Sequence, residues 1–235
     1  MLLYIIRHGD PIYDPDCLTP KGHLQAAAVA KRLARHGIDR IYASPMIRAQ
    51  QTAQPLSELL HLPVNIEDWT SEARAWEDFS VYIGGVCTWF WLDRVEELVN
   101  DGTVDMRDWY NMPALREYAP RFKSGLERIA RCSDEFLARH GYRREGALYR
   151  VERPNDERVA VFCHEGFGKS WMSHLMSVPL HLYATEYEIT HTGVVVVELR
   201  NTESGLTRPK CLAWSDMSHI YAEGLPMQHN NGVYI

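Results

Sequence analysis

The sequence predicts an α/β fold, in which a mostly parallel central sheet carries helices on both faces. Short continuous apolar segments, typical of buried strands, alternate with helical segments at both ends of the chain. The chain has 235 residues, of which 46 % are hydrophobic and 24 % charged, as in soluble globular proteins with a sizeable core. We therefore predict a single domain over residues 1–235, with a mainly helical insertion at residues 76–141.

The first part of the chain shows the clearest alternation of strands and helices. Residues 2–6 form an apolar run that predicts a buried strand, and the loop Arg7-His8-Gly9 follows it. Thr19 suits an N-cap and Pro20 suits the first helical position, so we expect a helix from there to the glycine at position 37. Further elements are expected as a strand at 39–43, a helix at 47–60 and a short strand at 63–66.

The middle and last parts of the chain differ in character. Residues 76–141 are expected to be mainly helical, with helices at 88–100 and 119–140, and to lie over the sheet. Residues 143–158 are rich in charge and are expected to form a loop. The alternation then resumes, with strands expected at 158–163, 193–199 and 210–214 and a helix at 169–176.

Composition excludes several classes of protein. The formal net charge is −6, whereas a general nucleic-acid-binding protein usually carries a basic excess. The five cysteines are widely spaced and form no CxxC pair, so neither a disulfide framework nor a zinc site is expected. The sequence has neither a signal-peptide pattern nor an apolar stretch long enough to span a membrane. We expect a cytoplasmic protein, monomeric or homodimeric, without metal, cofactor or membrane contact.

Residues suited to phosphate chemistry lie where three of the expected strands end. Arg7 and His8 follow the first strand, Arg48 lies one turn into the helix after the second, and His164 follows the strand at 158–163. If these strands are parallel neighbours, the four side chains meet at one edge of the sheet. Two arginines bind phosphate through charge-assisted hydrogen bonds, a neutral histidine can act as a nucleophile, and a protonated histidine can stabilise phosphoryl charge. The pattern predicts a phosphoryl-transfer site that needs no metal.

Five short blocks outside the insertion form a wider pattern. They are LYIIRHG at 3–9, LTPKG with QA at 18–26, SPMIRAQQTA at 44–53, VAVFCHEG at 159–166 and SHI at 218–220. Together they resemble the histidine phosphatase superfamily, also called phosphoglycerate mutase-like. The resemblance implies a mostly parallel central sheet with helices on both faces, which agrees with the direct reading of the chain.

The resemblance also implies a role for each matching residue. His8 would be the nucleophile that carries a transient phosphohistidine. Arg7, Arg48 and His164 would bind the phosphoryl oxygens. The family uses a carboxylic acid between the arginine and histidine blocks as proton donor, and Glu72 is our candidate, because one carboxyl can protonate the leaving alkoxide and then deprotonate water. The competing candidates for this acid are Glu77, Asp78 and Asp10.

Two acidic residues depart from the family pattern. Asp10 stands where the family often has glutamate, and Glu165 follows His164 where glycine is more usual. A carboxylate next to a phosphate site repels phosphate unless it is turned away or paired with a cation. Lys169, or an arginine of the insertion, could be the partner of Glu165. We expect Asp10 and Glu165 to lie in the substrate pocket.

The residues after the first histidine separate two enzyme functions. The mutase branch of the family carries a longer recognisable stretch there, and residues 12–17 do not resemble it. We therefore predict a metal-independent phosphomonoesterase that acts on a small phosphorylated metabolite. The alternatives are a phosphoglycerate mutase-type phosphotransferase and a phosphate-binding module without catalysis.

Tryptophans are concentrated between the two blocks that carry Arg48 and His164. Five of the seven lie there, at positions 69, 76, 89, 91 and 109. One interpretation is that they pack the insertion against the sheet. The other is that Trp89 and Trp91 line an apolar pocket for the part of the substrate that is not phosphate.

Overall fold

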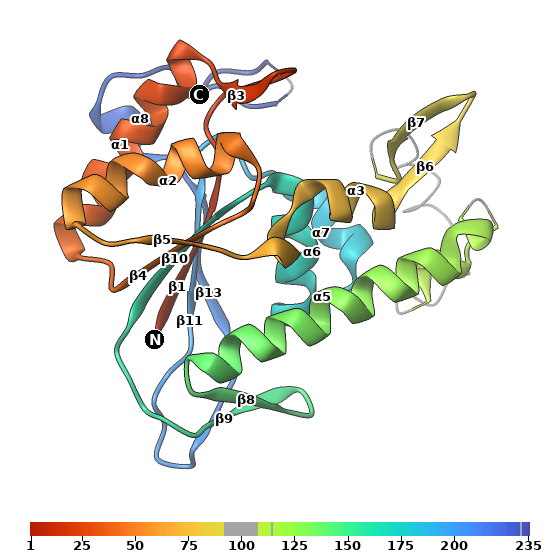
Figure 1. The fold of residues 1–235 in the computed structure, drawn as a ribbon. Coiled ribbons are helices and arrows are strands. Elements are labelled where there is room, and N and C mark those ends of the chain that lie inside the picture. Colours follow the sequence, from red (N-terminus) through yellow and green to blue (C-terminus); the bar gives the residue numbers. More distant parts are fainter. Residues whose placement is uncertain (92–107, 114, 231) are drawn as a thin grey trace.

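A six-stranded sheet forms the centre of the computed structural model, which describes residues 1–91, 108–113, 115–230 and 232–235 (Figure 1). The strand order is β13-β11-β1-β10-β4-β5. Strands β1, β10, β4 and β5 are parallel, and β11 is antiparallel to both of its neighbours. This confirms the predicted mostly parallel sheet. The strands are β1 (Leu2–Arg7), β4 (Arg40–Ala43), β5 (Val64–Ile66), β10 (Arg158–Cys163), β11 (Val194–Glu198) and β13 (Lys210–Asp216).

Helices cover both faces of the sheet. The helices α5 and α6 lie on one side of the sheet, and α1 and α2 lie on the other (Figure 1). Because side chains alternate along a strand, Leu3 and Ile5 of β1 pack with α5 and α6, whereas Ile6 packs with α1 and α2. None of the helices in the described ranges is both long and apolar enough to cross a membrane. The helices are α1 (Pro20–His36), α2 (Ile47–Leu60), α3 (Glu72–Phe79), α5 (Ala119–Arg139), α6 (Glu165–Met176), α7 (Leu180–Glu186) and α8 (Ser218–Ala222).

Side chains accept hydrogen bonds from the first turns of α1 and α2. The Thr19 hydroxyl accepts a hydrogen bond from the Gly22 N–H at 3.0 Å, as the sequence predicts. At the start of α2, the Asp16 carboxylate accepts a hydrogen bond from the Ile47 N–H at 2.7 Å. Asp16 belongs to the short hairpin β2 (Pro11–Tyr13) and β3 (Asp16–Leu18), so this hairpin is tied to α2.

The segment at 76–141 is less helical than predicted. It begins with the last turn of α3, and a hairpin follows, formed by β6 (Ser80–Ile83) and β7 (Val86–Trp89), with Gly84 and Gly85 at positive φ in the turn. The predicted helix at 88–100 is therefore wrong at its start, and its residues 92–100 lie outside the described residues. Single turns at Trp109–Asn111 and Arg116–Tyr118 lead into α5, which confirms the helix predicted at 119–140. Whether this segment acts as a cover for the pocket stays a prediction.

The charged stretch at 143–158 contains strands in place of the predicted loop. Strands β8 (Tyr142–Glu145) and β9 (Leu148–Val151) form a hairpin, which β12 (Leu206–Thr207) extends. Ion pairs run across this hairpin between Arg143 and Glu152 and between Arg150 and Glu145. These charges are solvated on the outer surface, so the stretch lacks the apolar pattern by which a strand is recognised.

Candidate active site

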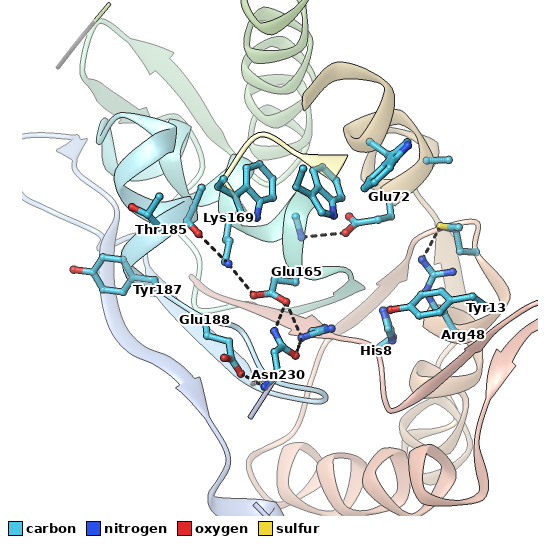
Figure 2. Close-up of a pocket in the computed structure, with 18 of the residues that line it drawn as sticks. His8, Tyr13, Arg48, Glu72, Glu165, Lys169, Thr185, Tyr187, Glu188 and Asn230 are labelled. Carbon is cyan, nitrogen blue, oxygen red and sulfur yellow. Dashed lines mark hydrogen bonds and ion pairs between the residues drawn. The ribbon is translucent and has the colours of Figure 1, made fainter. Parts of the chain in front are cut away.

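A pocket of about 930 Å³ lies at the carboxyl ends of β1 and β10 (Figure 2). The two strands are parallel with Arg7 opposite Cys163, so the residues that follow them, His8 and His164, become neighbours. Their ring centroids are 5.2 Å apart. Arg48 comes from the first turn of α2 and lines the pocket with Arg7 and His8. The structure therefore brings together the residues predicted for phosphate chemistry.

His8 is held as a neutral ring with one nitrogen left to react. Its Nδ1 lies 2.7 Å from the Gly9 carbonyl oxygen, which can only accept, so Nδ1 carries the proton and Nε2 carries the lone pair. Burial lowers the pKa of His8 well below its ordinary value, and the positive potential of His164 and Arg7 lowers it further. A neutral imidazole at this position has the electronic form that a nucleophile needs.

His164 lies beside His8 and is almost fully buried. Its Nε2 is 2.8 Å from the Ser44 hydroxyl, and its Nδ1 has no partner among the described residues. Burial, followed by the charges of Arg48 and Arg7, lowers the pKa of His164 well below its ordinary value. A phosphoryl dianion at the site would act in the opposite direction, because it favours the protonated ring.

Both guanidinium groups are anchored by contacts within the chain, and Arg48 Nη2 also lies 3.4 Å from Met46 Sδ. Arg7 Nη1 donates to the carbonyl of Ile189 at 2.7 Å and to the side-chain oxygen of Asn230 at 2.9 Å. Arg48 Nη1 donates to Asp16 Oδ1 at 2.7 Å. The Nε atoms of both arginines are buried without a partner in the part of the chain that is described. The anchors fix each guanidinium plane, which favours directed contacts to an anion.

Glu72 is the candidate acid that the structure brings into the pocket. Its two carboxylate oxygens accept the backbone N–H of Gly166 at 3.1 Å (Figure 2) and that of Phe167 at 2.9 Å. Burial raises the pKa of Glu72, although these two hydrogen bonds and the charge of Arg48 oppose the shift. A carboxyl that holds its proton to higher pH than usual is suited to general acid catalysis.

The same two hydrogen bonds explain where α6 begins. The helix begins at Glu165, four residues before the predicted start at 169. Gly166 and Gly168 disfavour helix by themselves, which hides the first turn from a sequence reading. Glu72, distant in sequence, accepts two N–H groups of this turn and so replaces a local cap.

The competing carboxylates lie elsewhere. Asp78 pairs with Arg128 at 2.6 Å, and neither it nor Glu77 is among the pocket-lining residues. Asp10 also lies outside the lining, although we expected it in the pocket. Its carboxylate accepts a hydrogen bond from Thr19 at 2.7 Å, because the hairpin β2–β3 brings Asp10 next to the N-cap of α1.

Glu165 lines the pocket as a paired carboxylate. Its oxygens lie 2.8 Å from Arg7 Nη1 and 2.8 Å from Lys169 Nζ, and the Asn230 side chain donates to it at 2.7 Å (Figure 2). Burial would raise the pKa of Glu165, but Arg7 and Lys169 outweigh burial and hold that pKa below its ordinary value. The expectation that Lys169 could pair with this departure from the family pattern is confirmed.

The tryptophans of the middle segment divide between core and pocket. Trp69 and Trp109 are buried in the apolar core. Trp76, Trp89 and Trp91 line the pocket. Trp89 stacks on Trp91 with ring centroids 4.6 Å apart, and Trp76 meets Trp89 edge-on at 4.9 Å.

Sequence reasoning missed several residues of the site. His191 lies with its ring 5.7 Å from that of His8, and its Nδ1 is 3.6 Å from Asp10 Oδ1. Because β11 is antiparallel, the residues before it lie at the same edge as the residues after the parallel strands, and this signal could have identified His191. Asn230 and Tyr13 carry no local sequence signal. Tyr13 packs its ring 5.3 Å from the Arg48 guanidinium.

No set of His, Cys, Asp and Glu side chains within the described residues is arranged to hold a metal ion.

Residues 3–79 match the sequence profile described as histidine phosphatase superfamily (branch 1). The match covers about a third of the chain, and it includes Arg7, His8 and Arg48. Over this part the chain is similar to the histidine phosphatase superfamily.

Two relatives carry the name phosphoserine phosphatase, one of them as putative. Phosphoserine phosphatase 1 of Hydrogenobacter thermophilus is 28 % identical over 150 residues, which cover 59 % of this chain and 65 % of that protein. The chain thus spans slightly less than two thirds of the relative. A putative phosphoserine phosphatase 2 of the same organism is 33 % identical over 76 residues, which cover 28 % of this chain and 37 % of that protein.

Solved structures share the fold over almost the whole chain. Phosphoserine phosphatase of Entamoeba histolytica, in complex with 3-phosphoglyceric acid, aligns with a TM-score of 0.60 and 19 % identity over 93 % of this chain and 98 % of its own. A mycobacterial glucosyl-3-phosphoglycerate phosphatase aligns with a TM-score of 0.57 and 16 % identity over 91 % of this chain and 98 % of its own. At these identities the alignments establish the fold.

Proposed function

We propose that the protein is a phosphatase that hydrolyses small phosphate monoesters through a phosphohistidine on His8, without a metal. The observation that carries the proposal is the neutral His8 ring. Its Nδ1–H donates to Gly9, and it lies in one pocket with Arg7, Arg48 and Glu72. The guanidinium groups supply the positive charge that phosphoryl transfer requires, and the carboxyl supplies a proton.

The first chemical step forms the phosphoenzyme. His8 Nε2 attacks phosphorus, a P–N bond forms, and the bond from phosphorus to the ester oxygen breaks. Arg7, Arg48 and His164 hold the phosphoryl oxygens, and Glu72 gives its proton to the departing oxygen. The Gly9 carbonyl accepts from Nδ1–H throughout and stabilises the charge that develops on the ring.

The second step returns the enzyme to its starting state. Water attacks phosphorus and transfers a proton to the Glu72 carboxylate, the P–N bond breaks, and His8 Nε2 regains its lone pair. Inorganic phosphate leaves, and Glu72 is again protonated. Dividing hydrolysis into two displacements replaces one difficult step by two easier ones.

The names of the relatives make phosphoserine and 3-phosphoglycerate the first substrates to test. We expect release of inorganic phosphate from small esters in the presence of EDTA. His8→Asn should abolish it, whereas the matched control His23→Asn, at an exposed histidine of α1, should retain it. A strict metal requirement, or turnover that survives in His8→Asn, would contradict the proposal.

The same assay separates the alternatives. Transfer of phosphate within 3-phosphoglycerate, without release of inorganic phosphate, would indicate a mutase. Tight binding of phosphate with no turnover of any ester would indicate a binding module.

A further inference from the structure

The chemistry proposed above fixes where the alcohol part of the substrate must lie. A general acid acts within hydrogen-bond distance of the atom that it protonates, so the ester oxygen lies next to Glu72. The carbon skeleton of the substrate therefore begins at this carboxyl and extends over the side chains that surround it. What surrounds Glu72 decides which alcohols fit.

Two indole rings flank Glu72. Trp76 is four residues after Glu72 on α3, so both side chains lie on the same face of that helix. Trp89 lies against Gly166, the residue whose N–H binds Glu72. An ideal Cβ on Gly166 would be 2.7 Å from the Trp89 ring and 3.0 Å from Glu72 Oε1. The acid and the two indoles therefore form one wall of the pocket.

This wall is held rigidly before any substrate arrives. Trp89 is stacked on Trp91, whose side chain is 5 % exposed, and the planes of the two rings differ by 16°. Lys169 lies with its Nζ 5.9 Å from the centre of the Trp91 ring. A preformed aromatic surface binds a further aromatic ring at little cost in conformational entropy and adds edge or offset-stacking contacts.

The charged side chains of Glu165 and Lys169, which lie close to the phosphate-binding residue Arg7, already form ion pairs within the chain. Glu165 lies between Arg7 and Lys169, and Lys169 Nζ also donates to the Ala184 carbonyl at 3.3 Å. A substrate carboxylate or ammonium at this point would have to break a buried ion pair, which is costly. This part of the pocket therefore favours an uncharged group next to the ester oxygen, although Glu186 and Glu188 also line the pocket. The pocket volume of about 930 Å³ accommodates a leaving group of substantial size.

We propose that the substrate is a phosphate monoester whose alcohol carries an aromatic ring close to the ester oxygen, and that Trp76 and Trp89 bind this ring. The inference rests on the proposed phosphatase function, because Glu72 locates the leaving group. Across the pocket, Thr185 and Tyr187 lie opposite His8 and Arg48 and leave room for polar groups at the far end of the substrate (Figure 2).

The ring site is tested by binding and turnover measured in parallel. Calorimetry measures the affinities of benzylphosphonate and methylphosphonate, neither of which can be hydrolysed. Steady-state kinetics measure kcat/KM for benzyl phosphate, ethyl phosphate and phosphoserine. We expect benzylphosphonate to bind at least about ten-fold more tightly than methylphosphonate. Benzyl phosphate should have the highest kcat/KM of the three esters.

Variants of Trp76 and Trp89 test whether these two residues cause the preference for a ligand with an aromatic ring. Trp76→Leu should reduce the ratio of the two phosphonate affinities by several-fold. The control Tyr82→Leu, at an exposed residue of β6 outside the pocket lining, should leave this ratio unchanged. Trp89→Leu provides a second wall variant, and thermal unfolding verifies that each variant folds.

The outcomes distinguish the ring site from the phosphatase function. Equal affinities for the two phosphonates, or a ratio that neither tryptophan variant alters, would overturn the ring site. Hydrolysis of phosphoserine in strong preference to benzyl phosphate would also overturn it and would leave the phosphatase proposal intact. If no ester is hydrolysed, the phosphatase proposal fails, and the phosphonate ratio still decides whether the wall binds a ring.

Discussion

A single methyl group added at Gly166 tests the packing that links Glu72, Trp89 and α6. The new Cβ would be 2.7 and 2.8 Å from two Trp89 ring atoms and 3.0 Å from Glu72 Oε1. Ordinary contacts between carbon atoms are about 3.5–4.0 Å, so the overlap with the ring is about 0.8 Å. Trp89 cannot move back freely, because Trp91 is stacked behind it at 4.6 Å.

The size of the effect follows from two opposing contributions to stability. Overpacking of this kind lowers the free energy of unfolding by about 1–3 kcal/mol, and the better helix propensity of alanine restores up to about 1 kcal/mol. We expect Gly166→Ala to be less stable by about 1–2 kcal/mol, which lowers Tm by roughly 2–8 °C in a domain of this size. Displacement of Glu72 should lower kcat for an alkyl phosphate by about ten- to a hundred-fold.

Thermal unfolding and steady-state kinetics measure both effects, and Gly168→Ala is the matched control. At Gly168, in the same helix, a Cβ would meet only the flexible end of Ile189 at 3.1 Å and Ile5 at 3.9 Å. This variant should have nearly wild-type stability and kcat. Equal behaviour of the two variants would refute the close packing of Gly166 against the acid and the indole wall.

Two further predictions concern charge at the site. The pH dependence of kcat/KM for an alkyl phosphate should peak on the acidic side of neutrality. The lowered pKa of His8 keeps the ring neutral below its ordinary 6.5, and the raised pKa of Glu72 keeps that carboxyl protonated above its ordinary 4.5. The value of kcat/KM should then fall at higher pH, as Glu72 loses its proton. If the same fall at high pH is seen in Glu72→Gln, Glu72 is not the general acid. Asp16→Asn should weaken binding of inorganic phosphate about ten-fold in calorimetry, because Arg48 loses its charged anchor at 2.7 Å. Unchanged affinity would show that this anchor does not position Arg48.

Much of the fold and the phosphate end of the site could be predicted from sequence, because both depend on local pattern. The apolar runs of β1 and β10 identify buried strands, and parallel pairing then brings His8 and His164 together. The Thr19 cap and the following proline likewise predict the start of α1. These features depend on residues that are close together in the sequence.

The remaining features depend on contacts between distant residues. Asn230 reaches Arg7 across more than two hundred positions, and no local signal marks it. The start of α6 depends on hydrogen bonds to Glu72, which is distant in the sequence. Strand β8 is rich in charged residues that pair across its hairpin, so it lacks the apolar pattern of a strand. The resemblance to the family pattern predicts Asp10 in the pocket, but its carboxylate binds the Thr19 hydroxyl at the start of α1.

The central claim is that His8 carries the phosphoryl group between the two steps. Wild-type protein is mixed with a slowly hydrolysed ester, quenched in alkali to preserve phosphohistidine, and measured by intact mass and peptide mapping. We predict one added phosphoryl group, located on His8 and absent in His8→Asn. A phosphoryl group on His164 or His191, or undiminished ester hydrolysis by His8→Asn, would contradict the claim.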